Sequence, residues 1–220
     1  MYKVTIKSFL FYIFVLIMNA ETIKTILIDF LISQNDSIVL GSEVTYGSKK
    51  QVVDIIQLSK NKIIAFEVKA DRDDIRRLDN QINEYKKIFD HIYVVCTSKL
   101  LCKIQEKTDQ TIGILLVRAE GVIEIKRKAI QQRRYDKKSI LETINAAYLK
   151  KTFNLSQKFT ANETRSLLAY KNIKELKSTL YSYLETFLSE KYSLFLSEKG
   201  VNTHIDDLPI LSIHRREITF

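Results

Sequence analysis

The chain has 220 residues, 45% of them hydrophobic, and a formal net charge of +9. This length suffices for one domain of moderate size, or for a compact domain with a helical appendage. The positive charge favours an anionic partner, and we expect nucleic acid ahead of a membrane surface. Two cysteines without a CxxC spacing argue against a zinc cluster and a disulfide-bonded secreted scaffold, so we expect a reducing, cytoplasmic location.

Residues 1–19 form an N-terminal extension of uncertain status. Lys3 and Lys7 precede an apolar run at residues 9–18, which is shorter than a transmembrane helix requires. The segment "MNAETIKTILIDFL" then resembles a fresh protein start, so we favour Met18 as the initiator. A signal cleavage site near Ala20 and a membrane anchor over residues 9–18 are the alternatives. A membrane partner is expected only in the last case.

The next hundred residues alternate between helical and strand-like periodicity. A stripe of apolar residues spaced by three and four predicts an amphipathic helix first, and period-two runs predict strands after it. The order predicts an α/β fold of the restriction-endonuclease-like type, a mixed sheet flanked by helices. The expected elements are helix 21–33, strands 37–46, 51–58 and 62–70, helix 72–89, strand 91–97, helix 98–107, and strands 112–118 and 122–128.

Beyond about residue 130 the pattern is predominantly helical. Long apolar periodicity covers residues 139–153 and 161–196, and an irregular end follows at 204–216. We therefore expect a sheet domain at 20–130 and a C-terminal helical appendage at 131–220, packed on that domain.

Charged residues interrupt two of the predicted strands. Because side chains alternate along a strand, Glu67 and Lys69 project from the same face. If the strands pair across the turn at 59–61, Asp54 lies near the level of Glu67. Two carboxylates on neighbouring strands could bind one Mg²⁺, which is commonly held by one or two carboxylates and substrate phosphate. As an alternative, these charges lie on a solvent-exposed face of the strands, which would produce the same sequence pattern.

Further polar residues could join this constellation. Glu43, near the end of the preceding strand, could supply a third carboxylate. Gln81 and Tyr85 stand four residues apart on the following helix, where they could reach the same site, and Arg77 extends that row. As an alternative, Tyr85 contributes to the apolar stripe of the helix and Gln81 only borders it.

The joint spacing resembles the PD-(D/E)xK nuclease superfamily. That superfamily has a core of helix, three strands, helix and strand, with an acid on the second strand and an ExK triplet on the third. More narrowly, "VVDII", "FEVKADRDDIRRLDNQINEYKKIFD" and "IYVV" look similar to a family of uncharacterised bacterial proteins, the sce-type family. The resemblance covers roughly residues 20–130. The departures are mild: Val53 stands where the proline of the superfamily's name would be, and Ala70 replaces the usual serine.

The resemblance implies a role for each matching residue. Asp54 and Glu67 would ligate the metal, Lys69 would position the attacking water, and Glu43 would support the metal site. Val68, between the acid and the lysine of the triplet, belongs to the implied metal-binding set. Gln81 and Tyr85 match a QxxxY helix found in some branches. The implied cofactor is Mg²⁺, with Mn²⁺ able to substitute, and no small-molecule cofactor is expected.

A basic run from Lys126 to Lys138 could contact a nucleic-acid backbone, or it could be a solvated linker. With Arg77, the candidate nucleic-acid-binding residues are Lys126, Arg127, Lys128, Arg133 and Arg134.

We expect a Mg²⁺-dependent endo- or exodeoxyribonuclease that acts on DNA and could form a homodimer. A catalytically silent DNA-binding or regulatory module with the same fold is the alternative. A membrane-tethered protein is a third possibility.

Overall fold

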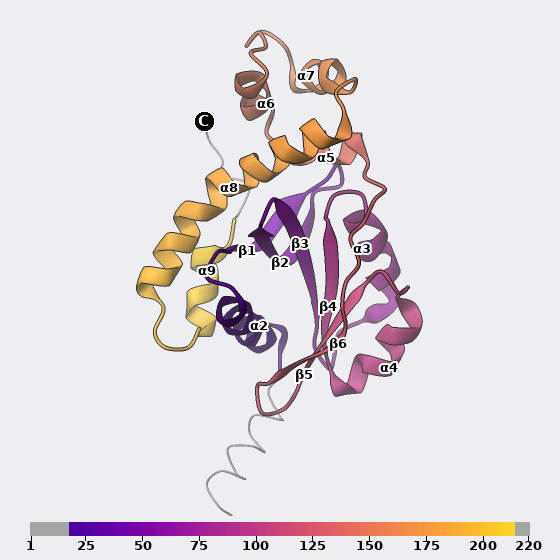
Figure 1. Cartoon of the computed structure of the whole chain (residues 1–220), viewed down its shortest axis with the longest axis vertical. Coiled ribbons are helices and arrows are strands. Elements are labelled where there is room, and N and C mark those ends of the chain that lie inside the picture. The colour runs from indigo at the N-terminus through magenta and orange to yellow at the C-terminus, as the bar shows by residue number, and fades with distance from the viewer. Residues whose placement is uncertain (1–17, 214–220) are drawn as a thin grey trace, which may run out of the picture.

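The computed structural model describes residues 18–213 and shows one mixed six-stranded sheet covered by helices (Figure 1). The strands follow one another across the sheet in chain order. This architecture confirms the predicted fold class. The strands are β1 (Val39–Tyr46), β2 (Gln51–Ser59), β3 (Lys62–Lys69), β4 (His91–Thr97), β5 (Gly113–Val117) and β6 (Ile123–Arg127).

The type of strand pairing changes twice across the sheet. Strands β1, β2 and β3 are antiparallel, β3, β4 and β5 are parallel, and β6 returns antiparallel to β5. A two-residue turn joins β2 to β3, with Lys60 and Asn61 both at positive φ. Such a turn matches the twist of the strands and sets their register. The parallel strands are connected through helices, as a parallel pair requires.

The helices cover both faces of the sheet. In Figure 1, α2 lies on one side and α3 and α4 lie on the other. The helical elements are α2 (Ala20–Gln34), η1 (Ile75–Arg77), α3 (Leu78–Tyr85), α4 (Ser98–Lys107), α5 (Lys137–Thr143), α6 (Ala146–Thr152), α7 (Ala161–Leu168), α8 (Ile173–Glu198), η2 (Ile205–Asp207) and α9 (Leu208–Leu211).

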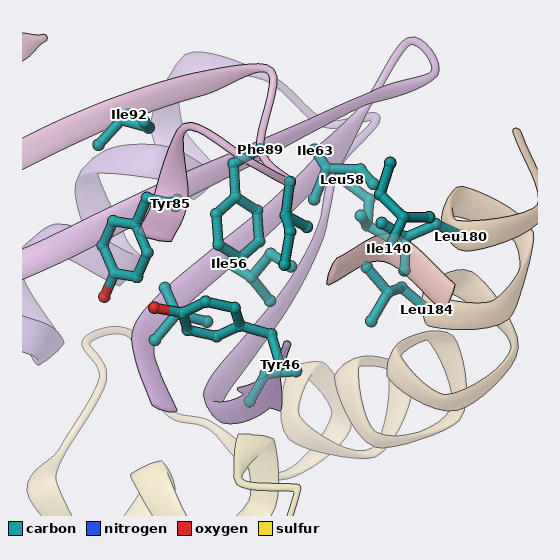
Figure 2. Packing of buried hydrophobic residues seen from close by; sticks show 14 of the residues in the cluster. Tyr46, Ile56, Leu58, Ile63, Tyr85, Phe89, Ile92, Ile140, Leu180 and Leu184 are labelled. Carbon is teal, nitrogen blue, oxygen red and sulfur yellow. The ribbon is translucent and has the colours of Figure 1, made fainter. Parts of the chain in front are cut away.

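Each face of the sheet has its own hydrophobic cluster. The first combines strand residues such as Ala65 with side chains of α3, α4, α5 and α8, and Figure 2 shows part of it. The second combines Phe66 and Val68 with α2, α9 and the end of α8. Ala65 and Phe66, which are neighbours in the chain, thus belong to different clusters. This is expected for a strand buried on both faces, because successive side chains point to opposite faces of the sheet. The C-terminal helices therefore pack on the sheet, as predicted.

Strand β1 switches faces at Glu43. Leu40 belongs to the second cluster and Val44 to the first, although residues four apart on a regular strand share a face. Between them Glu43 adopts a left-handed conformation with φ of 53°. This conformation is uncommon outside glycine and costs roughly 1–3 kcal/mol. The break turns the remainder of β1 toward the cluster that borders the candidate site.

Three predicted helices differ in extent. The helix expected at 72–89 is shorter because the Asp73 carboxylate accepts the Ala70 N–H at 2.8 Å, and Asp74 caps the short turn η1. Short acidic side chains of this kind offer the backbone an alternative to helix. The segment 139–153 divides into α5 and α6 where Asn145 caps α6. The segment 161–196 divides into α7 and α8 where Asn172 caps α8.

No helix within residues 18–213 is long and apolar enough to cross a membrane. The apolar run at 9–18 lies, apart from Met18, outside the described residues. Cys96 is buried in β4 and Cys102 is exposed on α4, and both are free thiols.

Candidate active site at the ends of β2 and β3

Asp54 and Glu67 lie side by side on neighbouring strands. The ladder between β2 and β3 pairs Ile55 with Phe66, and the two acids follow directly beyond that pair. At this point Val68 donates its main-chain N–H to Asp54 Oδ2 at 2.8 Å. The structure thus brings the two predicted carboxylates to one level of the sheet.

Glu67 is the centre of a buried hydrogen-bond network. The residue is only 3% exposed. Its Oε1 accepts bonds from Lys69 Nζ at 2.7 Å and from Gln81 Nε2 at 2.6 Å, and its Oε2 accepts the Tyr85 hydroxyl. Lys69 also donates to Gln81 Oε1 at 3.1 Å. Four of the five residues predicted as catalytic therefore meet at one place: Glu67, Lys69, Gln81 and Tyr85.

Helix α3 delivers Gln81 and Tyr85 to this network. The two residues are one helical turn apart, so their side chains project from the same face. Tyr85 is fully buried, and its ring centroid lies 5.4 Å from those of Tyr46 and Phe89 (Figure 2). The two interpretations of Tyr85 are thus both right, because its ring packs in the core while its hydroxyl reaches Glu67.

The sequence reasoning missed Lys24, the basic residue beside the two other acids. Lys24 projects from α2 and is 6% exposed. Its Nζ lies 3.2 Å from Glu43 Oε1 and 3.7 Å from Asp54 Oδ1. A charged residue directly flanking the apolar stripe of the helix was the available signal. The ammonium group offsets the negative charge of both carboxylates.

Burial changes the acid–base behaviour of the site. Burial and, to a smaller extent, the negative charge of Glu67 raise the pKa of Asp54 to about 6. The Val68 amide and the ammonium groups of Lys24 and Lys69 counteract this rise. Burial, together with the charge of Glu67, also raises the pKa of Tyr85 above its ordinary value, so its hydroxyl stays protonated as a donor. For Asp54 the effect of burial therefore outweighs the compensation that the amide and the two ammonium groups supply.

The two carboxylates fit a hard divalent cation. Within residues 18–213, no three or more acidic, histidine or cysteine side chains gather closely enough to hold a metal ion. Mg²⁺ needs fewer protein ligands, because water and substrate phosphate complete its shell. A carboxylate offers about four acceptor sites, of which Glu67 uses three. Asp54 Oδ1 lies 3.7 Å from Lys24 Nζ and accepts no hydrogen bond from residues 18–213, so both acids retain acceptor capacity.

Val68 can take part only through its main chain. Its side chain packs in the second hydrophobic cluster, on the face away from Glu67. An isopropyl group cannot bind a cation, whereas the Val68 main chain lies beside Asp54.

A groove of about 230 Å³ opens beside Lys24 and Glu43, with walls from α2, β1 and the C-terminal segment. The Ile213 N–H donates to the Ser42 carbonyl at 3.2 Å and fastens that segment to β1. The C-terminal region is therefore one wall of a groove beside Lys24 and Glu43, and Asp54 and Glu67 do not line this groove. The lining residues are Glu21, Lys24, Ser42, Glu43, Ile205, Leu208, Pro209 and Ser212.

Among the predicted nucleic-acid-binding residues, only Arg77 is close in sequence to a residue of the Glu67 hydrogen-bond network. It is exposed and directly precedes α3, one turn before Gln81. Lys126 pairs with Glu124, and Arg127 donates to the Ile112 carbonyl at 2.6 Å, so both have local partners. Strands β4 and β5 separate β6 from β3.

The basic run after β6 crosses the other end of the sheet. Ile130 and Gln132 donate their N–H groups to the carbonyls of Thr111 and Asp90, directly before β5 and β4 begin. Glu67 and Lys69 lie at the opposite end, where the parallel strand β3 ends. Lys128, Arg133 and Arg134 are exposed on this run and do not converge on the carboxylates.

Together, fold and site define an α/β protein whose mixed sheet carries a buried cluster of carboxylates, lysine, glutamine and tyrosine at the ends of two strands. The pattern of the family described as "Bacteriophage P4 protein cII" matches residues 17–212. The chain belongs to this family.

One curated protein and one solved structure are similar to this chain. Protein cII of Enterobacteria phage P4 is 23% identical over 121 residues, which are 54% of this chain and 45% of that protein. The chain thus matches about half the length of its curated relative. A solved structure of a protein of unknown function from Silicibacter pomeroyi is similar over 65% of this chain and 85% of that one, with 20% identity and a TM-score of 0.38. Neither name states an activity or a ligand.

Proposed function

We propose that this protein is a Mg²⁺-dependent nuclease that hydrolyses DNA phosphodiester bonds in the cytoplasm, with Mn²⁺ able to replace Mg²⁺. The observation that carries the proposal is the convergence of Lys69, Gln81 and Tyr85 on the buried Glu67, with Asp54 on the neighbouring strand. The resemblance of these residues to the PD-(D/E)xK nuclease superfamily supports the same conclusion.

The energetic cost of the cluster also favours a functional role. Removing charges from water is expensive, and well-packed apolar residues often serve stability as well as a buried ion pair does. Glu67 is 3% exposed and Lys69 is 8% exposed, within a sheet whose other buried positions are mostly apolar. A buried charged cluster that carries this desolvation cost is typical of a site that performs chemistry.

The residues of the chain could prepare hydrolysis in the following way. A bound Mg²⁺ would supply positive charge for the phosphate oxygens and promote ionisation of water. Lys69 has three N–H donors and uses two of them on Glu67 and Gln81. Its third donor can orient the attacking water or a phosphate oxygen. Gln81 donates to Glu67 and accepts from Lys69, so it fixes both side chains relative to each other.

The silent DNA-binding module is the competing function, and one observation favours it. Both oxygens of Glu67 already accept hydrogen bonds from the chain, so the network does not require a cation to hold it together. Calorimetric titration separates the two functions. A nuclease should bind Mn²⁺ and lose that binding in Asp54→Ala. A silent module should bind DNA in a salt-sensitive way and no metal.

Cleavage tests the proposal. Purified protein should convert plasmid or linear DNA to shorter products with Mg²⁺ and not with EDTA, and Asp54→Ala should abolish this conversion. Asp79→Ala is the matched control, because Asp79 is an exposed acid that pairs with Lys107 on the surface. Equal cleavage by Asp54→Ala and wild type would defeat the assignment.

A further inference from the structure

A second polar groove, of about 560 Å³, lies far from the carboxylates and is named here the α8 groove. Four parts of the chain that are distant in the sequence form it: the turn between β2 and β3, Asp90 directly before β4, the irregular segment after β6, and the first turns of α8. Its lining residues are Asn61, Lys62, Asp90, Gln131, Gln132, Arg133, Tyr135, Ile173, Lys174, Lys177, Ser178 and Tyr181.

The floor of the α8 groove contains a neutralised acid. Asp90 is 3% exposed and accepts bonds from the Ile63 N–H at 2.8 Å, the Tyr135 hydroxyl at 2.7 Å and Lys177 Nζ at 3.1 Å. Lys177 also donates to the Ile88 carbonyl at 2.6 Å and lies 4.5 Å from the centroid of the Tyr135 ring. Because Lys177 balances its charge, Asp90 does not repel an anion above it.

The rim of the groove carries cations without counter-ions. Among the described residues, no carboxylate lies within ion-pairing distance of Lys62, Arg133 or Lys174, whereas Lys177 on the floor pairs with Asp90 at 3.1 Å. The amino-terminal end of the 26-residue helix α8 adds partial positive charge at the same place. The groove therefore concentrates positive charge beyond what its own acid can offset.

The cations are held by rigid backbone. The turn before Lys62 has both central residues in the left-handed conformation that suits a two-residue hairpin. The segment that carries Arg133 is fixed by N–H bonds from Gln132 to Asp90 and from Asp136 to Lys87, at 2.8 and 2.9 Å. An anion would thus meet a preformed surface.

The character of the groove indicates a polyanion. Its cations stand on an open rim, and the Lys177 ammonium covers one face of the Tyr135 ring. None of the large exposed hydrophobic residues of the described chain lines the groove, which argues against insertion into lipid. Contacts from Lys and Arg to phosphates supply nearly all of the affinity with which a protein binds nucleic acid irrespective of sequence.

We propose that the α8 groove binds the phosphate backbone of DNA at the end of the sheet opposite the candidate active site. Lys62, Arg133 and Lys174 make the contacts, and Lys177 keeps the floor neutral. This binding does not require cleavage, so it holds for either of the two functions considered above.

The test measures DNA affinity as a function of salt. The full chain, in EDTA, is titrated into a fluorescently labelled duplex, and anisotropy is recorded over a series of salt concentrations. The groove variant combines Lys62→Ala, Arg133→Ala and Lys174→Ala. The control variant combines Lys99→Ala, Lys103→Ala and Lys158→Ala, which remove the same charge from exposed lysines elsewhere. Thermal unfolding checks that both variants are folded.

The groove variant should lose at least about tenfold in affinity, and its log–log salt slope should fall in magnitude by about 2 to 3, near 0.9 per lost phosphate contact. The control variant should keep the wild-type slope. Two results would overturn the inference directly: equal slopes for the groove and control variants, or no DNA binding by the wild type. A third would assign the groove to a membrane surface instead: the groove variant loses the binding of the wild type to anionic lipid vesicles while its DNA binding is unchanged. A protein that binds DNA through the groove without cleaving it would instead defeat only the nuclease proposal.

Discussion

The main-chain N–H of Val68 and the carboxylate of Asp54 meet at 2.8 Å, directly beyond the last paired residues of β2 and β3. Beyond the pair of Ile55 and Phe66, this bond from backbone to side chain takes the place of a backbone hydrogen bond between the two strands. It holds one Asp54 oxygen in place, and the other, Oδ1, lies 3.7 Å from Lys24 Nζ. The geometry of the acid pair is thus set by the sheet itself rather than by flexible side chains.

Asp54 should lower the stability of the metal-free protein at neutral pH. Its folded pKa of about 6 lies above the ordinary value of 3.8. An acid with a raised folded pKa contributes stability below about pH 4, and that contribution is lost as the pH rises through about 6. We expect Asp54→Asn to match wild type in melting temperature near pH 4 and to exceed it at pH 7. A variant that is less stable than wild type only at pH 7 would contradict this expectation.

Tyr85 should stabilise the fold through its hydroxyl. Tyr85→Phe keeps the ring contacts with Tyr46 and Phe89 but leaves Oε2 of the buried Glu67 without its donor. We expect a loss of about 1–3 kcal/mol in the free energy of unfolding, measured in urea. Tyr170→Phe is the control, because Tyr170 is 77% exposed, and it should change stability little. Equal effects of the two substitutions would show that Glu67 does not depend on this bond.

Lys24 should contribute to stability through the two acids beside it. Lys24→Met keeps most of the side-chain volume and removes the ammonium near Glu43 and Asp54. Since Glu43 is 45% exposed, the expected loss is on the order of 1–2 kcal/mol at pH 7, and it should shrink on acidification. Lys107→Met breaks an exposed pair and should cost less. Unfolding of the two variants at the same urea concentration would rule out this role for Lys24.

Gly41 should be required for the close approach of α8 to β1. A Cβ at Gly41 would lie 2.2 Å from Leu188 Cδ2 and 3.2 Å from Ile56 Cγ2, and both residues are fully buried. Gly41→Ala should therefore destabilise the protein by roughly 1–3 kcal/mol. Gly200→Ala meets nothing within 4 Å and serves as the control in thermal unfolding. Unchanged stability of Gly41→Ala would mean that α8 moves aside freely.

Local periodicity was sufficient to predict much of the site. The alternation of side chains along β3 places Glu67 and Lys69 on one face, and the spacing of four on α3 places Gln81 with Tyr85. Both relations depend only on the geometry of one element, and the hairpin turn adds the pairing with Asp54.

The remainder depends on how elements pack, which no local pattern contains. Lys24 reaches the acids because α2 packs against the sheet beside β1. The left-handed conformation at Glu43 could not be predicted, because the residue that adopts it is not a glycine. The α8 groove unites residues more than one hundred positions apart, such as Lys62 and Lys174. The predicted helix bounds were wrong where the side chains of Asp73, Asn145 and Asn172 accept hydrogen bonds from nearby backbone N–H groups. The spacing of apolar residues contains no information about such caps.

The central claim is that Lys69 takes part in phosphodiester hydrolysis, and single-turnover cleavage of DNA by Lys69→Ala tests it most directly. DNA binding is measured in parallel, and Lys107→Ala, which removes an exposed lysine, is the matched control. Removing a group that orients the attacking water should slow cleavage by about 100-fold or more with DNA affinity unchanged, while the control cleaves at the wild-type rate. Cleavage by Lys69→Ala at the wild-type rate would contradict the claim.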